Sequence, residues 1–248
     1  MAYVNKRFQT NMFDQMLFPN DIEGVLMERQ FTSDMLEKAA EFRQNVLMKG
    51  LARLNEQSTT WRRPVNVERV ILVVGQVESD RSLKHGAQSI RTNLGLLQEV
   101  CHTNSDAYIV YKPHPEVIVD MQFGGLAYQD VCQWFDEIVG DVTLHQLIPK
   151  VNEVHVMNSL AGFEALLRGK KVSCYGHSFY AGWGLTHDMV PMPERPRQLG
   201  LDELVAGAMF SFPRYMNRLA GKRCNTNDPS EDKHPLWRSE LTQASARV

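Results

Sequence analysis

The chain has 248 residues, enough for one large or two small domains with a sizeable core. Its 43% hydrophobic and 23% charged residues are ordinary for a globular protein. The formal net charge of −2 gives no reason to expect a nucleic-acid partner, and we expect none. No apolar run approaches the roughly 18–20 residues of a bilayer-spanning helix, and the amino-terminal residues lack the basic-then-apolar pattern of a secretory signal.

Cysteine and histidine spacing gives no sign of a metal centre or a disulfide framework. The four cysteines lie far apart with no CxxC pair, and the eight histidines are scattered with no HExxH motif. Widely spaced thiols are typical of a protein in the reducing cytoplasm. We therefore expect no metal site and no cofactor.

Residues 1–64 predict a helical segment that precedes the main sheet. Residues 1–20 show no clear periodicity, but apolar residues recur at helical spacing from Thr32 to Leu54. Thr32 or Ser33 can cap the start of this helix. The polar stretch 55–60 is expected to close the helix, and residues 61–64 are expected to be a linker.

Short apolar runs alternate with helical patterns between residues 65 and 214. The first run, Val70–Val74, is continuous and β-branched, which is typical of a strand buried on both faces of a parallel sheet. The predicted strands are 69–75, 107–111, 142–144, 154–157 and 171–175, and the predicted helices are 86–100, 161–167 and 201–210, with a turn or short helix at 146–150. This alternation predicts an α/β domain with a Rossmann-like parallel sheet and helices on both faces. The polar tail, 215–248, is expected to lie at the periphery.

The sequence KPHP, at residues 112–115, follows the second predicted strand. Each proline fixes φ and removes a backbone donor, so we expect the segment to continue neither as a strand nor as a helix. His114 would then lie on a stiff loop at the carboxyl end of a strand, where α/β proteins bind ligands. The segment is either a rigid turn with an incidental histidine or an anion-binding loop.

The loop after the first strand, GQVESDRS at residues 75–82, carries the two carboxylates Glu78 and Asp80. It does not match the GxGxxG pattern of dinucleotide-binding proteins. Two carboxylates so close can serve as a nucleophile and an acid/base, or they can cap the helix that follows.

A third stretch, residues 158–166, begins where the strand 154–157 ends. Free amides at the start of the next helix, together with the Ser159 hydroxyl, would form a ready anion site. Glu164 follows after about a turn and a half. It can accept hydrogen bonds from ribose hydroxyls, or it is an ordinary surface residue. Because the loop with His114 also follows a strand, the two loops together favour a nucleotide phosphate as the ligand.

The stretch GHSFYAGWGLT, residues 176–186, combines aromatic residues with glycines and is neither a helix nor a regular strand. Such loops can build a wall around a flat or sugar-like ligand. Tyr180 and Trp183 are the aromatic residues that we expect to contact a ligand there. The alternative is a hydrophobic loop that packs on the edge of the domain.

These stretches together resemble the capsule polysaccharide biosynthesis family. The motifs are GQVESDRSL, YKPHPEV, SLAGFEALLRGKKV, YGHSFYAGWGLTHD and LDELVAGAMFSFPRY, in that order, between about residues 30 and 225. More closely, they are similar to the C-terminal module of KpsC-type retaining β-Kdo transferases. The resemblance implies a GT-B-like glycosyltransferase, of which residues 65–214 would be the donor-binding half.

The resemblance also implies the reaction and its partners. The donor would be CMP-β-Kdo, where Kdo is 3-deoxy-D-manno-oct-2-ulosonic acid. The acceptor would be a growing β-Kdo linker on a phospholipid at the cytoplasmic face of the inner membrane. No cofactor is implied, whereas a capsule assembly and export complex is implied as a further partner.

Individual residues match the motifs of that family. His114 and Pro115 match the HP motif that contacts the CMP phosphate, and Ser159 and Glu164 match the residues that hold phosphate and ribose. Asp80 matches the nucleophile of a QxxxD pattern that begins at Gln76, with Glu78 as a further candidate catalytic residue. The other residues expected to contact CMP-Kdo are Lys112, Gly162, Tyr180 and Trp183. The Kdo carboxylate can pair with Lys112, Arg81 or Arg195.

Two features depart from the family pattern. Ser79 stands where the family has a second acidic residue, and only about sixty residues precede the first core strand, too few for a full acceptor-binding domain. Two alternatives therefore stand beside the transferase: a truncated, inactive CMP-sugar-binding fragment, and an interaction protein of capsule export.

Overall fold

The computed structural model describes residues 19–54, 61–79, 83, 86, 89–122, 131–211, 216–217 and 222–223. Its central sheet has six parallel strands in the order β3-β2-β1-β4-β5-β6. The strands are β1 (Val70–Val74), β2 (Tyr108–Lys112), β3 (Glu137–Ile138), β4 (Glu153–Val156), β5 (Lys171–Cys174) and β6 (His187–Asp188). The α-helices are α2 (Pro19–Glu28), α3 (Ser33–Leu54), α5 (Asn93–Thr103), α6 (Pro115–Gln122), α8 (Leu144–Leu147), α9 (Leu160–Leu167) and α10 (Leu201–Val205). The shorter elements are the 3-10 turns η1 (Cys132–Trp134) and η2 (Ile148–Lys150), the π-helical turn η3 (Ala206–Ser211) and the antiparallel pair β7 (Met216–Asn217) and β8 (Lys222–Arg223).

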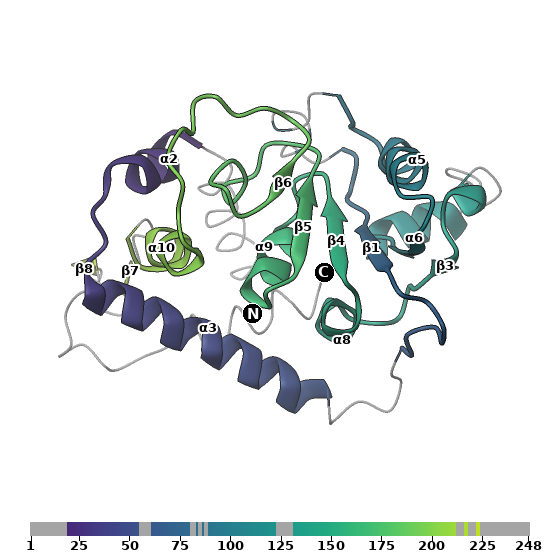
Figure 1. Cartoon of the computed structure of the whole chain (residues 1–248), viewed down its shortest axis with the longest axis horizontal. Coiled ribbons are helices and arrows are strands. Elements are labelled where there is room, and N and C mark those ends of the chain that lie inside the picture. The colour runs from purple at the N-terminus through teal and green to yellow at the C-terminus, as the bar shows by residue number, and fades with distance from the viewer. Residues whose placement is uncertain are drawn as a thin grey trace.

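Hydrophobic cores lie on both faces of the sheet. Successive side chains of a strand point to opposite faces, so Ile71 and Val73 pack with α5, whereas Leu72 and Val74 pack with α9 and α10. Every residue of β1 is buried, and each such apolar side chain stabilises the fold by about 1.5–3 kcal/mol. Figure 1 shows α5 on one side of the sheet and α9 on the other. The predicted Rossmann-like sheet with helices on both faces is confirmed.

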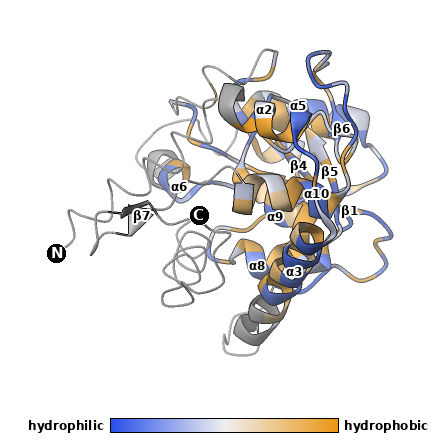
Figure 2. Ribbon diagram, turned by 90° about the vertical axis from the view of Figure 1, so that its left-hand side faces the viewer, coloured by the Kyte–Doolittle hydropathy of each residue, from blue (hydrophilic) through white to orange (hydrophobic). Residues whose placement is uncertain are grey.

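Helices α2 and α3 extend the core on the α9 face. Thr32 caps α3, because the Met35 N–H donates to its Oγ1 at 3.4 Å. Phe42 of α3 packs edge-on against Phe210, with ring centroids 5.8 Å apart. Hydrophobic residues gather where α3, α9 and α10 meet (Figure 2). None of the helices in the described ranges is long and apolar enough to cross a membrane.

Two elements lie elsewhere than the sequence predicted. Residues 142–144 form no strand, and β3 lies earlier, at Glu137–Ile138. The reason is a capping box: Thr143 precedes α8, and its N–H donates to Oε1 of Gln146 at 3.3 Å. The helix expected from residue 86 begins at Asn93, where Thr92 accepts the Gly95 N–H at 3.1 Å.

The KPHP segment also differs from the prediction, because a helix follows it directly. Pro115 is the first residue of α6. A proline is tolerated at the first helical position, since the N–H that it lacks would have no partner there and its φ already suits a helix. The two prolines therefore end a strand and start a helix within four residues.

Candidate functional site

The carboxyl ends of the parallel strands form one edge of the sheet, where α/β proteins bind ligands. β1 lies between β2 and β4, so the loops that follow these three strands are neighbours. The loop after β5 adjoins the loop after β4. The predicted site residues at the ends of these strands therefore come from adjoining positions along a single edge.

Gln76 joins the loop after β1 to the loop after β4. Its Nε2 donates to Asn158 Oδ1 at 2.9 Å, and its Oε1 accepts the backbone N–H of Asn158 at 3.0 Å. Its own backbone N–H donates to Asn93 Oδ1 at 2.8 Å, and its carbonyl accepts from Asn93 Nδ2 at 2.8 Å. Since both ends of the carboxamide are occupied, Gln76 fixes the two loops relative to each other.

Glu78 contacts the start of the helix that follows its loop. Its Oε1 accepts the N–H of Asn93, the first residue of α5, at 2.7 Å. Glu78 and Thr92 together satisfy N–H groups that have no partner inside the helix. Of the two roles open to Glu78, capping is the one for which the structure has a contact. Asp80, the predicted nucleophile, lies outside the described residues.

His114 stands directly before α6. Its Nδ1 accepts the Glu116 N–H at 3.2 Å, and its carbonyl accepts the Ile118 N–H at 3.1 Å. A neutral imidazole that accepts at Nδ1 carries its proton on Nε2. In this tautomer Nε2 is a donor, which suits an anion such as phosphate. The ring is half-buried, and Pro115 beside it is exposed.

Lys112 ends β2 with its ammonium turned into the protein. The residue is 5% exposed, and its Nζ donates to the Gly140 carbonyl at 2.7 Å. Burial lowers the pKa of this ammonium, and the nearby Asp141 carboxylate acts in the opposite direction. Lys112 therefore holds the loop after β3 against the same edge.

The start of α9 combines a side-chain cap with a close aromatic contact. Ser159 is the N-cap, and its Oγ accepts the Ala161 N–H at 3.3 Å. Its carbonyl accepts the hydroxyl of Tyr180. A Cβ atom at Gly162 would overlap that hydroxyl, so only glycine fits there without displacement. Gly162 thus allows α9 to lie close to the aromatic loop, residues 176–186.

Glu164 is half-buried on α9, and its Oε2 is buried beside two nitrogen-bearing side chains. Its Oε2 lies 3.6 Å from Arg168 Nη1 and 3.9 Å from His145 Nδ1, and it has no hydrogen-bond partner among the described residues. Burial raises the pKa of this carboxyl, and the Arg168 charge opposes that shift. Arg168 Nη2 lies 2.6 Å from His145 Nδ1, so the histidine must accept there and is neutral. A buried acceptor without a hydrogen-bond partner is unusual in a folded protein.

The two predicted ligand-wall aromatics lie in the core instead. Tyr180 and Trp183 are both 0% exposed, and the Trp183 indole donates to the Phe179 carbonyl at 2.8 Å. The guanidinium of Arg195 lies 5.3 Å from the Trp183 ring centroid and donates to the Ser178 carbonyl at 2.6 Å. The loop therefore fits the alternative interpretation, a hydrophobic loop that packs on the edge of the domain. These contacts hold the Arg195 guanidinium inside the loop.

Four further residues contribute to these contacts and were not among the predicted site residues: Asn158, His145, Arg168 and His177. Arg168 follows Glu164 by four positions, a spacing that places both side chains on one helix face, so the sequence held this signal. His177 donates its N–H to the Gly86 carbonyl at 2.7 Å, and its Nε2 is buried without a partner in the described ranges. No cluster of three or more possible metal ligands occurs among the residues that the structure describes.

Comparison with known proteins assigns the chain to a family. The family described as "Capsule polysaccharide biosynthesis protein" matches residues 43–223. The chain belongs to this family. It is 39% identical over 199 residues to the capsule polysaccharide modification protein LipA of Neisseria meningitidis serogroup B. It is 36% identical over 201 residues to the lipopolysaccharide-processing protein LpsZ of Rhizobium meliloti.

Two solved structures of the family's fold resemble the chain. The Thermosulfurimonas dismutans KpsC β-Kdo 2,7 transferase is 42% identical, with a TM-score of 0.67 over 83% of this chain. The β-Kdo 2,4 transferase of the same protein is 27% identical, with a TM-score of 0.62 over 82% of this chain.

The matches cover only part of each relative. The match to LipA covers 80% of this chain but 28% of LipA. The match to LpsZ covers 79% of this chain but 46% of LpsZ. The chain spans 62% and 64% of the two KpsC chains. The residues that match the family, 43–223, contain the sheet edge described above.

Proposed function

We propose that this chain is the CMP-sugar-binding module of a capsule polysaccharide glycosyltransferase that transfers Kdo from CMP-β-Kdo with retention. The observation that carries this proposal is the buried Oε2 of Glu164, which has no hydrogen-bond partner among the described residues and lies on a helix whose capped start is at the same sheet edge as His114. The similarity to the two KpsC Kdo transferases supports the choice of sugar.

Each group at the edge has a role in binding CMP. Nε2–H of His114 and the N-terminus of α9 at Ser159 hold the phosphate, because both present donors to an anion. Glu164 accepts hydrogen bonds from the ribose hydroxyls, which supply the donors that its Oε2 lacks. Arg168 lies beside this carboxylate and favours its charged form.

Retention at the anomeric carbon follows from two successive displacements. In the first, a carboxylate oxygen of Asp80 bonds to the anomeric carbon of Kdo, and the bond from that carbon to the phosphate oxygen breaks. CMP leaves with the electron pair, and His114 stabilises its charge. In the second, an acceptor hydroxyl attacks the same carbon, loses its proton to a base and releases Asp80.

The acceptor in this proposal is a Kdo-bearing phospholipid, so the module works at the cytoplasmic face of the inner membrane. Its product is a β-Kdo linker for a capsule assembly and export machinery. A GT-B partner domain would close over the sheet edge and supply the acceptor site.

Calorimetric titration with CMP tests the proposal. Wild type should bind CMP, and His114→Ala should bind it at least about tenfold more weakly, because a charge-assisted hydrogen bond is lost. Affinity should not change when EDTA is added, since no step of the mechanism requires a divalent cation.

Equal CMP affinity of wild type and His114→Ala would contradict the proposed phosphate site, and loss of binding with EDTA would contradict the metal-free mechanism. CMP binding without Kdo transfer, when acceptor is supplied, would favour a binding module over an enzyme. Absence of any CMP binding would favour a role as an interaction protein of capsule export.

A further inference from the structure

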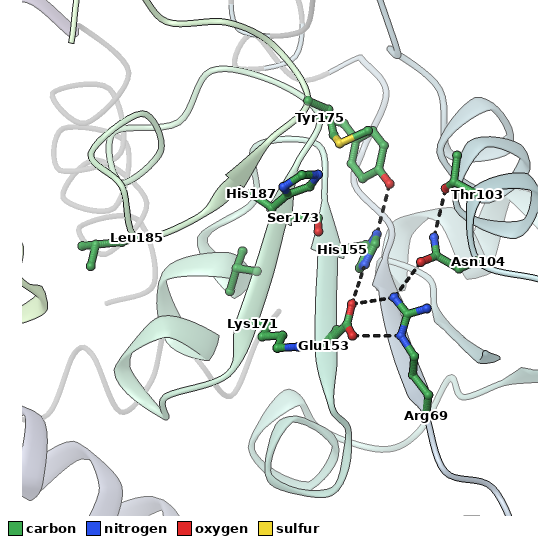
Figure 3. Close-up of a pocket in the computed structure, with 12 residues that line it drawn as sticks. Arg69, Thr103, Asn104, Glu153, His155, Lys171, Ser173, Tyr175, Leu185 and His187 are labelled. Atoms are coloured by element: carbon green, nitrogen blue, oxygen red, sulfur yellow. Dashed lines mark hydrogen bonds and ion pairs between the residues drawn. The ribbon is translucent and has the colours of Figure 1, made fainter. Parts of the chain in front are cut away.

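A pocket of about 480 Å³, lined mostly by polar residues, lies on the face of the sheet formed by β4, β5 and β6. Figure 3 shows it between these strands and the end of α5. In the strand pairing, His155, Ser173 and His187 stand side by side on three neighbouring strands, and Glu153 stands beside Lys171. Parallel sheets are usually covered on both faces by apolar side chains and helices, so a polar, hollowed face is unusual.

One side of the pocket is a chain of polar contacts, in which the buried Nε2 of His155 has no hydrogen-bond partner among the described residues. Arg69 holds the Glu153 carboxylate with two bonds of 2.9 Å and also donates to Asn104 at 2.7 Å. His155 lies between Glu153 and Tyr175, with Nε2 3.6 Å from the carboxylate and Nδ1 3.1 Å from the tyrosine hydroxyl. This chain of contacts is drawn in Figure 3. Because Arg69 neutralises it, Glu153 adds no net charge to the pocket.

The other side of the pocket carries donors that are not used. Lys171, Ser173 and His187 line the pocket, and their side chains make no hydrogen bond or ion pair within the part of the chain that the structure describes. Lys171 and His187 are exposed, so their nitrogen atoms are open to a ligand. An ammonium, a hydroxyl and an imidazole on adjacent strands offer both positive charge and hydroxyl-type hydrogen bonding.

We propose that this pocket is a second binding site, which takes a small hydroxyl-bearing anion of the sugar-acid class. The carboxylate of the ligand pairs with Lys171 and His187. The hydroxyls of the ligand form hydrogen bonds with Ser173 and Glu153. The pocket volume is sufficient for one such sugar. The site lies on the face of the sheet, so it is separate from the donor edge. The use of Kdo as the test ligand rests on the proposed function.

Ligand-observed NMR titration tests the site with three probes: free Kdo, the neutral ketose D-fructose and inorganic phosphate. Kdo should bind wild type at least about tenfold more tightly than fructose, because fructose lacks the charge that Lys171 pairs with. Lys171→Met and His187→Gln should each weaken Kdo binding by about tenfold. The matched control Lys38→Met, an exposed lysine on α3, should bind Kdo like wild type.

Each alternative result identifies a different failure. Unchanged Kdo binding in both Lys171→Met and His187→Gln overturns the site. Equal binding of fructose, or displacement of Kdo by phosphate at a lower concentration, overturns the sugar-acid assignment. His114→Ala keeps Kdo binding at this pocket even where it loses CMP, so failure of the donor site and failure of this site are distinguishable. Equal thermal midpoints of the variants show that the fold is retained.

Discussion

Glu164 is a half-buried residue whose Oε2 is buried without a hydrogen-bond partner among the described residues. Its pKa is raised by burial above the ordinary value of 4.5. A raised carboxyl pKa means that the folded state favours the protonated form. The stability that this group contributes is therefore present below the unfolded pKa and is lost as the pH rises through the folded pKa. At neutral pH its charge therefore costs stability, and the proposed role in binding ribose would account for that cost.

Replacing Glu164 by Gln should separate stability from binding. The amide removes a buried charge, so the thermal midpoint at pH 7 should equal or exceed that of wild type. CMP binding by calorimetry should weaken about tenfold, because a charged acceptor becomes a neutral one. The loss should be smaller for 2′-deoxy-CMP, which lacks one of the hydroxyls.

The control for this substitution is Glu41→Gln, at an exposed position of α3, which should change neither quantity. A lower midpoint with unchanged CMP affinity would mean that Glu164 serves the fold alone, and the ribose role would then be wrong.

His155 gives a second prediction at this scale, about pH. Burial lowers its pKa to about 4 from 6.5, and it faces Glu153, Arg69 and His187. A depressed histidine pKa contributes stability that is present above pH 6.5 and is lost as the pH falls toward 4. Between pH 7 and pH 5, wild type should lose roughly 2 kcal/mol more unfolding free energy than His155→Gln does. Urea unfolding at the two pH values measures this difference, and parallel losses would show that His155 does not titrate as described.

At the scale of elements, the position of α9 depends on its contact with the aromatic loop. A Cβ at Gly162 would overlap the Tyr180 hydroxyl, which donates to the Ser159 carbonyl at the start of the helix. Gly162→Ala should therefore destabilise the protein by about 1–3 kcal/mol in urea unfolding and should also weaken CMP binding.

Gly24→Ala in α2 is the matched control, because nothing lies within 4 Å of the added Cβ. That substitution should raise stability by about 0.5–1 kcal/mol, since alanine is the better helix former. Equal changes in unfolding free energy for the two substitutions would mean that the contact between Gly162 and Tyr180 does not fix the position of α9.

Much of the element order could be predicted from the sequence, for physical reasons. A run such as Val70–Val74 has no polar residue to place in water, so it predicts a buried strand directly. The errors lie at boundaries, where competing local contacts decide. Thr143 reads as a strand residue but caps α8, and Pro115 reads as a helix breaker but starts α6.

The sequence predicted where along the chain the candidate site residues lie, but it did not predict which side chains contact one another. The strand-end loops at His114 and Ser159 follow from strand order, since parallel strands end at one edge. The burial of Tyr180 and Trp183 could not be read from the sequence, because an aromatic residue beside glycine suits both a ligand wall and a core. The pairing of His145 with Arg168 joins residues 23 positions apart and has no local signal.

At the scale of the whole molecule, arginines join the amino-terminal helices to the sheet's own helices and loops. Arg195 is buried, pairs with Glu23 of α2 and donates to carbonyls of the aromatic loop. Arg43 of α3 pairs with Asp202 of α10 at 3.0 Å, but both side chains are partly exposed. These contacts tie α2 and α3 to the α/β core.

The loss of unfolding free energy on replacing an arginine should be larger where the arginine is more buried. Arg195→Met should cost about 3–5 kcal/mol, because it breaks a buried pair and leaves carbonyl groups without donors. Arg43→Met should cost no more than about 1 kcal/mol, as for a partly exposed pair. Urea unfolding of both variants measures the two costs, and equal costs would show that burial does not set the strength of these contacts.

The most direct measurement for the proposed mechanism is mass spectrometry of the protein after incubation with CMP-β-Kdo in the absence of acceptor. The two-step mechanism predicts that wild type carries one covalently bound Kdo, mapped by peptide analysis to Asp80. Asp80→Ala should carry none, although it still binds CMP, because a nucleophile acts mainly in the transition state. A Kdo adduct on another residue, or Asp80→Ala that still transfers Kdo with an unchanged linkage, would contradict the mechanism.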